Sequence, residues 1–189
     1  GKTMLSEAML RCANVIQRLG SVESGSTVSD YHQSEKERQI SVHASLLHAE
    51  WEDKKFNIID TPGYLDFISE GLGALRVGDF ALVVANASNG AELGTDQVWE
   101  YATGYGIPKM IVVNGADREN VNFDEVLEDL RSHFGSQVFP MTLPINPGPG
   151  FNKVLDVMRS GEIDYSTDGS GTFSEKPAEG EWQERVKEL

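Results

Sequence analysis

Short apolar runs alternate along this chain with segments of helical period, and this alternation most limits the possible folds. Runs of strand length lie at residues 48–52, 55–60, 80–87, 109–114 and 138–145, and each leads toward a polar or glycine-rich turn. Between them, three sets of apolar residues are each expected on one helical face: Leu5, Met9 and Cys12; Ile68, Leu72 and Leu75; Val126, Leu130 and Phe134. Gly135 is expected to cap the last of these helices. Strands alternating with helices predict the α/β class, with a mostly parallel sheet and helices on both faces.

Composition narrows the setting in which such a chain works. Its 189 residues are 39% apolar, enough for one main core. A single cysteine, Cys12, cannot form an internal disulfide, and the longest apolar run, residues 80–87, is too short to span a bilayer. The formal net charge of -14 opposes unaided binding to a phosphate backbone. We therefore expect a cytoplasmic protein region with no membrane contact and no autonomous nucleic-acid binding.

The chain is expected to divide near residue 160. From there the sequence reads "SGEIDYSTDGSGTFSEKPAEGE", rich in glycine, serine and acids, with little to bury. It ends in "EWQERVKEL", where Trp182, Val186 and Leu189 share one helical face that can dock on a neighbour. Residues 1–159 are predicted to form the main domain, and residues 160–189 a flexible linker or an insertion. The opening "GKTMLSEAML" has no initiator methionine and no lead-in strand, so a fragment of a longer chain is expected.

The first chemical motif is "GKT" at Gly1, Lys2 and Thr3, which opens a predicted helix. It matches the end of the phosphate-binding loop pattern GxxxxGK[ST], in which backbone amides and a lysine surround phosphates and the hydroxyl holds Mg²⁺. Three residues alone are a weak signal, since a helix start with an exposed lysine is the common alternative.

The second motif, "DTPG" at residues 60–63, follows an apolar strand. Asp60 stands at the carboxyl end of that strand, where open α/β sheets gather ligands and where an acid can contact Mg²⁺ through water. Gly63 has no side chain, so its amide can approach a terminal phosphate. An aspartate that only caps the next helix is the structural alternative for an isolated motif of this kind.

The third motif, "NGAD", ends another apolar strand with Asn114 and Asp117 three residues apart. A carboxylate there can accept the N1 hydrogen and the exocyclic amine of guanine, whereas adenine presents an acceptor at N1 and is disfavoured. Alone, Asn and Asp at a strand end are usually turn formers. Because they follow the other two motifs along the chain in this order, they favour a guanine-nucleotide site.

Together these motifs resemble those of translational GTPases, most closely elongation factor G and its diverged paralogues. "VSDYHQSEKERQISVHAS" is similar to that family's first switch, and "FNIIDTPGYLDF" to its second. The resemblance implies a phosphate-loop GTPase domain that lacks its first strand and part of the phosphate loop, with residues 160–189 starting an inserted subdomain. It also implies GTP or GDP with Mg²⁺ as cofactors and the ribosome as partner of the full-length protein. Ser41 is then expected on Mg²⁺ beside Thr3 and Asp60. The polar segment 24–41 is expected to be mobile without GTP.

The departures from the family pattern concern catalysis and affinity. Tyr64 stands where the family has a water-positioning histidine, and Gly115 where it has the lysine of NKxD. The glycine and threonine of ERGIT are Gln39 and Ser41. We expect slow GTP hydrolysis at the catalytic position Tyr64, and weaker nucleotide binding without the lysine stem. A GTP-binding ribosomal switch with little hydrolysis is the alternative function. A phosphate-loop ATPase or kinase outside translation is a weaker one, which Asp117 opposes.

Overall fold

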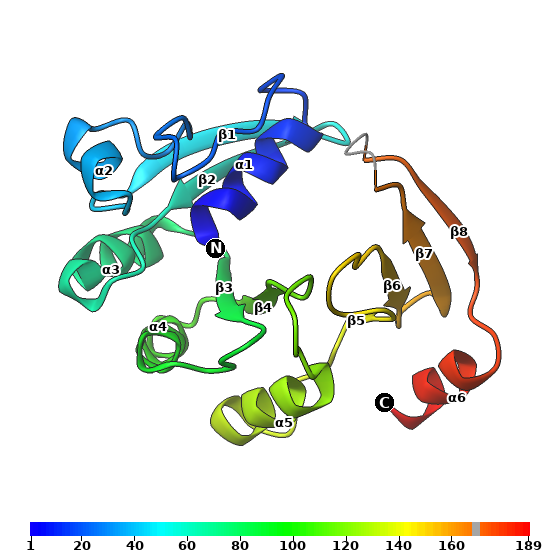
Figure 1. The fold of residues 1–189 in the computed structure, drawn as a ribbon. Helices are drawn as coiled ribbons and strands as arrows, with labels where there is room; N and C mark the ends of the chain where they lie inside the picture. Colours follow the sequence, from blue (N-terminus) through cyan, green and yellow to red (C-terminus); the bar gives the residue numbers. More distant parts are fainter. Residues whose placement is uncertain (168–170) are drawn as a thin grey trace. The chain divides into compact units, whose positions relative to one another are not determined.

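The computed structural model describes residues 1–167 and 171–189 (Figure 1). Contacts divide the chain into two compact units, one of residues 1–84 with 93–112 and one of residues 85–92 with 113–189. Each unit contains its own buried apolar clusters. Within the described ranges, every helix is too short or too polar to traverse a bilayer.

The first unit holds the amino-terminal elements. In chain order they are the α-helices α1 (Lys2–Cys12) and α2 (Gln33–Arg38), the strands β1 (Ser45–Trp51) and β2 (Lys54–Asp60), the 3-10 helix η1 (Leu65–Phe67), and the α-helices α3 (Ile68–Val77) and α4 (Leu93–Gly104). Most of β3 (Ala81–Asn86) and β4 (Lys109–Asn114) also belongs to it. Four predicted strands therefore lie close to their expected positions, although β1 begins at Ser45 rather than at residue 48.

The first two strands form an antiparallel hairpin, a pairing that the expected mostly parallel sheet did not include. Their register runs from Ser45 opposite Asp60 to Trp51 opposite Lys54. The turn between them consists of Glu52 and Asp53, with φ of 47° and 60°. A two-residue turn with positive φ at both positions connects antiparallel strands, whereas parallel strands need a long crossover. Helix α1 lies along this hairpin in Figure 1, with Leu10 packed among residues of β1.

Strands β3 and β4 are neighbours in a separate small sheet and run parallel. The amide of Ala81 donates to the carbonyl of Pro108, and the amide of Ala87 donates to that of Asn114, both at 2.9 Å. Both bonds have the same sequence offset, as parallel pairing requires, and α4 provides the crossover. The buried side chains Leu75, Ala81 and Ala102 join α3, β3 and α4 in one cluster. The described strands thus make three small sheets, not one large parallel sheet.

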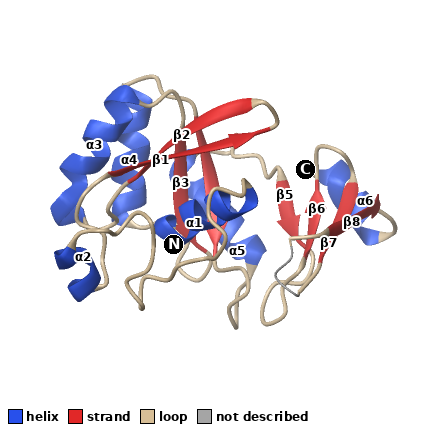
Figure 2. Ribbon diagram, turned by 90° about the horizontal axis from the view of Figure 1, so that it is seen from above, coloured by secondary structure: helices blue, strands red, loops and turns tan. Residues whose placement is uncertain are grey.

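The second unit combines one helix with an antiparallel sheet and a final helix. Its elements are α5 (Phe123–Phe134), β5 (Thr142–Pro144), β6 (Lys153–Asp156), β7 (Gly161–Tyr165), β8 (Phe173–Pro177) and α6 (Glu181–Glu188). The four strands pair in sequence order. Figure 2 shows α6 beside this sheet, where Trp182, Val186 and Leu189 pack against a cluster that includes Leu155. The prediction that this helical face docks on a neighbour is confirmed.

The predicted boundary between residues 159 and 160 falls between two paired strands, β6 and β7. Beyond it, the described residues form β7, β8 and α6 rather than a linker. Composition did not indicate this because all of β8 is exposed and its pairing uses backbone groups, which any side chain permits. Asp168, Gly169 and Ser170 of the predicted linker lie outside the described residues.

Two predicted helical faces differ in their outcome. In α5, Val126, Leu130 and Phe134 are buried, and Gly135 ends the helix with φ of 100°, as expected. In α1, the expected stripe of Leu5, Met9 and Cys12 is wrong, because Cys12 is exposed. The buried face is instead mostly polar: Thr3, Ser6, Glu7 and Leu10. Specific hydrogen bonds to Thr3 and Glu7 outweigh the apolar pattern there.

Candidate functional site

The residues of the first motif begin helix α1. Gly1 is the N-cap, and Lys2 and Thr3 occupy the first turn, where free backbone amides and the helix dipole favour an anion. Thr3 is 6% exposed, and its hydroxyl lies 3.1 Å from the hydroxyl of Ser41. The first motif and the first switch-like segment, 38 residues apart, therefore meet through two hydroxyls.

Asp60 ends β2 and joins the same group of side chains. It is 5% exposed, and its Oδ2 has no hydrogen-bond partner among the described residues. Burial raises the pKa of this carboxyl, although the hydroxyls of Ser29 and Thr3 act in the opposite direction. A buried carboxylate oxygen without a partner is costly unless a cation or another donor reaches it. Asp60 Oδ2 therefore has unused capacity to accept a hydrogen bond or to contact a cation.

Lys2 connects the first motif to the second. Burial lowers the pKa of its ammonium group, and the charge of Asp60 partly offsets this effect. Its Nζ lies only 2.8 Å from the position that a Cβ at residue 63 would occupy. A side chain at residue 63 would therefore displace the flexible end of Lys2 and move its ammonium group away from the second motif. Lys2, Thr3, Ser41, Asp60 and Gly63 thus lie close together.

Two residues of this group were missed from the sequence. Asp30 and Ser29 are 3% and 2% exposed; Asp30 Oδ2 has no hydrogen-bond partner in the described ranges, and the Ser29 hydroxyl acts on the pKa of Asp60. The charge of Asp30 also raises the pKa of Asp60. Both lie in a polar loop whose composition predicts solvent exposure. Only their position in the segment similar to the first switch could have indicated a role. The site therefore contains a second buried carboxyl group.

Buried glutamates hold the switch-like segment in place. Glu35, 1% exposed, accepts hydrogen bonds from the amides of His32, Val42 and His43 at 3.2, 3.0 and 3.0 Å. Burial alone would raise the pKa of Glu35, but these three amides outweigh it and the pKa is lowered. Glu7 of α1, also 1% exposed, accepts from the amides of Gly20 and Val28. The loop before β1 is thus anchored by carboxylates rather than by apolar packing.

Tyr64 is 57% exposed, unlike the buried Thr3 and Asp60. It caps the 3-10 helix η1 with an extended backbone, directly after Gly63. Its phenol makes no hydrogen bond within the part of the chain that the structure describes. No contact therefore fixes the direction in which its hydroxyl points.

Asn114 and Asp117 belong to the second unit and form a turn between β4 and α5. Asn114 ends β4, and Gly115 follows with φ of 88°, a conformation that favours glycine. Asp117 is exposed. The turn is tied to a later loop by the amide of Gly148, which donates to the carbonyl of Ala116 at 2.7 Å. The carboxylate of Asp117 is therefore presented to solvent on a braced turn.

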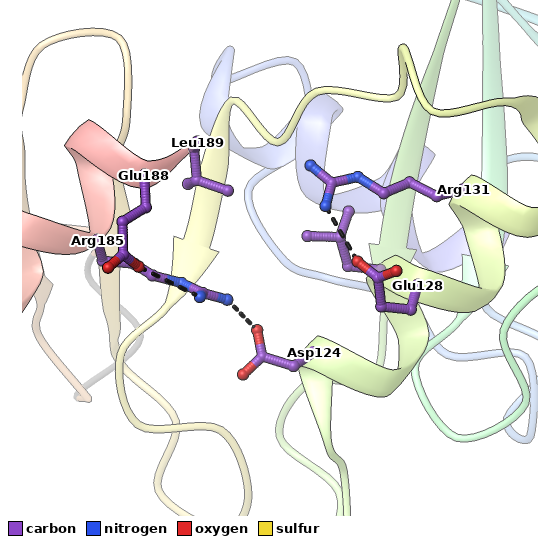
Figure 3. Close-up of a pocket in the computed structure, with 7 residues that line it drawn as sticks. Asp124, Glu128, Arg131, Arg185, Glu188 and Leu189 are labelled. Carbon is purple, nitrogen blue, oxygen red and sulfur yellow. Dashed lines mark hydrogen bonds and ion pairs between the residues drawn. The ribbon is translucent and has the colours of Figure 1, made fainter.

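A pocket of about 400 Å³ lies elsewhere in the second unit, between α5 and α6 (Figure 3). Its charged side chains are already paired, Arg185 with Asp124 and Arg131 with Glu128. Leu127 and Leu189 complete its lining. Paired charges and few free donors give this pocket no clear chemistry, so the candidate site rests on the motif residues.

Comparisons with known proteins agree with this reading of the motifs. The family model for the elongation factor Tu GTP-binding domain matches residues 1–178. Elongation factor G from Mycoplasma pneumoniae is 32% identical over 189 residues, covering all of this chain and 28% of that protein. A crystal structure of a Thermus thermophilus protein has a TM-score of 0.91 at 34% identity, over all of this chain and 28% of that one. The chain thus spans 28% of the length of each of these two relatives.

Proposed function

The chain belongs to the family of elongation factor Tu GTP-binding domains, and from this premise we propose that it binds GTP and GDP with Mg²⁺ in a ribosome-associated, elongation factor G-like protein. One observation carries the proposal: Thr3 of the phosphate loop touches Ser41 of the first switch-like segment. Asp60 of the second switch-like segment lies in the same buried group. These are the segments through which a GTPase detects the terminal phosphate.

The donor set fits Mg²⁺, which prefers hard oxygen ligands and keeps several waters. Thr3 and Ser41 offer two hydroxyls 3.1 Å apart, and Asp60 offers a buried oxygen without a partner among the described residues. We propose that the two hydroxyls bind the ion and that Asp60 holds it through water. When bound, the ion would neutralise phosphate charge.

The remaining residues are proposed to contact the phosphates, the guanine base and the attacking water. The amides at the start of α1 and the ammonium of Lys2 would hold the phosphate chain, and the bare Gly63 would let its amide approach the terminal phosphate. Asp117 would accept two hydrogen bonds from the guanine edge, with Asn114 bracing the turn. Tyr64 directly follows Gly63, the residue proposed to approach the terminal phosphate, and is therefore the candidate for orienting the attacking water.

Hydrolysis to GDP and phosphate is the proposed reaction, and a binding switch with little hydrolysis is the second candidate. The exposure of Tyr64 and the absence of a fixing hydrogen bond from the described residues favour the second candidate. Orienting a water requires a donor or acceptor in a defined direction. In either case the protein would act in the cytoplasm, where it would use nucleotide state to order its switch segments on the ribosome.

Two broader assignments accompany the proposal. In the complete domain, the parallel pair β3–β4 would belong to a larger, mostly parallel sheet with helices on both faces. Residues 160–189, with β7, β8 and α6, would begin a subdomain inserted into the GTPase domain. The packing of α6 on the sheet that begins at β5 supports a folded insertion over a linker.

Nucleotide binding and turnover by the full-length protein test the proposal. Calorimetry with GDP, GTP and ATP, each with and without Mg²⁺, is expected to give Mg²⁺-dependent binding of the guanine nucleotides and none of ATP. Single-turnover GTP hydrolysis with saturating ribosomes then separates the two candidates. Displacement of labelled GDP by ATP as readily as by GTP would refute the guanine assignment.

A further inference from the structure

Gly115 leaves a space that a neighbouring side chain fills. A Cβ built at this glycine would lie 3.3 Å from Arg118 Nε, 3.4 Å from its Cδ and 3.8 Å from its Cγ. These are the end of the aliphatic stem and the first atom of the guanidinium group. In the family pattern a lysine stem occupies residue 115 and lies along the base. Here the arginine three residues later covers the position from which that stem would start.

The local backbone holds Arg118 in this place. Its amide donates to the carbonyl of Gly115 at 3.2 Å, which closes the turn. Its own carbonyl lies 3.8 Å from the Cβ position of Gly148, whose amide donates to Ala116. The turn is therefore fixed on both sides, which sets where the arginine stem begins.

The guanidinium group itself remains available to a ligand. Arg118 is exposed, and its side chain makes no ion pair or hydrogen bond with residues in the described ranges. Asp117, its immediate neighbour, is exposed on the same turn. An exposed carboxylate and an exposed guanidinium group thus follow one another on this turn.

We propose that Arg118 stacks on the face of the guanine base and replaces the lysine stem that Gly115 lacks. This inference rests on the proposed function, because it needs a nucleotide base at Asp117. A guanidinium is planar, weakly hydrated and able to stack on aromatic rings and bases. Stacking tolerates any base, since every base has a π-face, whereas hydrogen bonds to the base edge select guanine. Arg118 therefore contributes affinity, and Asp117 contributes selectivity.

Calorimetry on the full-length protein tests this division with three probes: GDP, IDP and inorganic pyrophosphate. IDP lacks the exocyclic amine but keeps the ring face, and pyrophosphate lacks the base. Arg118→Ala is expected to weaken GDP and IDP by the same factor, about 10-fold, and to leave pyrophosphate unchanged. Arg118→Met keeps the stem without the charge and should lose only about 3-fold. Arg159→Ala, which removes another exposed arginine, is the control and should change GDP binding less than about 2-fold.

Each outcome decides for or against the inference. Unchanged GDP affinity in Arg118→Ala, while the unmodified protein binds GDP, would overturn the stacking role and leave the proposed function intact. A matching loss of pyrophosphate binding would overturn it as well, because the arginine would then hold phosphate. A loss for GDP but not IDP would overturn it too, because Arg118 would then read the base edge. If the unmodified protein bound no GDP, both the proposed function and this inference would fall. Circular dichroism checks the fold, and Arg118→Met decides if the alanine variant does not fold.

Discussion

Thr3 and Asp60, which are proposed to act at the phosphates, differ in burial from Asp117 and Arg118, which are proposed to contact the base. Thr3 and Asp60 are 6% and 5% exposed, and the pKa of Asp60 is raised by burial. Asp117 and Arg118 are exposed on a short turn. Buried polar groups depend on one another, so a change in one disturbs the others, whereas exposed groups can be changed singly. The phosphate residues should therefore resist substitution, and the base residues should tune affinity and selectivity.

Tyr64 departs from this contrast, because it is proposed to act at the phosphates and yet is exposed, and its replacement should have the largest effect. Tyr64→His is expected to raise single-turnover GTP hydrolysis on saturating ribosomes by about 100-fold, since a positioned catalytic group typically contributes about 100-fold to 10,000-fold. GDP affinity should stay unchanged. Tyr64→Phe is the control, and an unchanged rate in that variant would mean that the phenol plays no part. A rate in the unmodified protein that equals that of a histidine-bearing elongation factor G would remove the case for an impaired switch.

Asp117→Asn tests the tunable side of the comparison. The amide offers a donor where the carboxylate offers an acceptor, so preference should move from guanine toward xanthine nucleotides. A bidentate base contact is worth about 1–3 kcal/mol, and the ratio of GDP to XDP affinity should change by about 10-fold or more. Competition binding measures the ratio. Glu119→Gln changes an exposed acid two residues along the chain and should leave the ratio unaltered. An unaltered ratio in Asp117→Asn would exclude Asp117 as the base reader.

Asp60→Asn tests the buried side of the comparison through stability. Neutralising a buried carboxylate whose Oδ2 has no hydrogen-bond partner among the described residues should raise the free energy of unfolding of the nucleotide-free protein by about 1 kcal/mol. The same change should weaken Mg²⁺-dependent GDP binding about 10-fold, since the ion loses an acceptor. Urea denaturation and calorimetry measure the two effects. Asp79→Asn, at an exposed aspartate, should do neither. A loss of stability in Asp60→Asn would contradict the description of Asp60 as an unsatisfied carboxylate.

Glu35→Gln tests the anchoring of the switch-like segment. Losing an ionised acceptor of three amides should cost about 1–3 kcal/mol at pH 7. Because the pKa of Glu35 is lowered in the folded state, its stabilisation is present above the ordinary value of 4.5 and is lost as the pH falls through the folded pKa. The stabilities of the two proteins should therefore differ at pH 7 and converge as the pH falls below 4.5. Glu37→Gln on the same helix is the control, as Glu37 is exposed. Parallel pH profiles would argue against the anchor.

Gly115→Lys should have the smallest effect, although it restores the family residue. The new side chain would have to adopt φ of 88°, and its Cβ would lie 3.3 Å from Arg118 Nε. Strain and crowding should cancel any gain, so GDP affinity is expected to change less than about 2-fold. In an Arg118→Ala background the same substitution should recover affinity, because the space is then open. A clear gain in the unmodified background would show that the arginine does not occupy the lysine's place.

Sequence patterns predicted the first four strands and the buried face of α5, and the failures have identifiable causes. Strand β4 lies at its predicted bounds, and Thr3, Ser41 and Asp60 come together as expected, because apolar runs and short motifs carry their own geometry. The antiparallel hairpin was missed because its two turn residues, Glu52 and Asp53, are not typical of such turns.

Asp30 and Glu35 were missed for a different reason. Both are acids in a polar stretch, and nothing in their spacing separates a buried carboxylate from a solvated one. Glu35 accepts hydrogen bonds from amides seven and eight residues later, and the charge of Asp30 acts on Asp60, thirty residues later. Burial of a polar group is a property of the tertiary structure, so a single sequence cannot provide it.

The bonds to Glu35 also set how the segment around Ser41 can open. One carboxylate holds an amide before this residue, at His32, and two after it, at Val42 and His43. Release of the carboxylate frees both flanks at once, whereas fraying of one flank leaves the other attached. Opening should then be all-or-none, with a single rate for the whole segment. The segment should therefore have no populated partly open state, in contrast to a loop whose residues detach one after another.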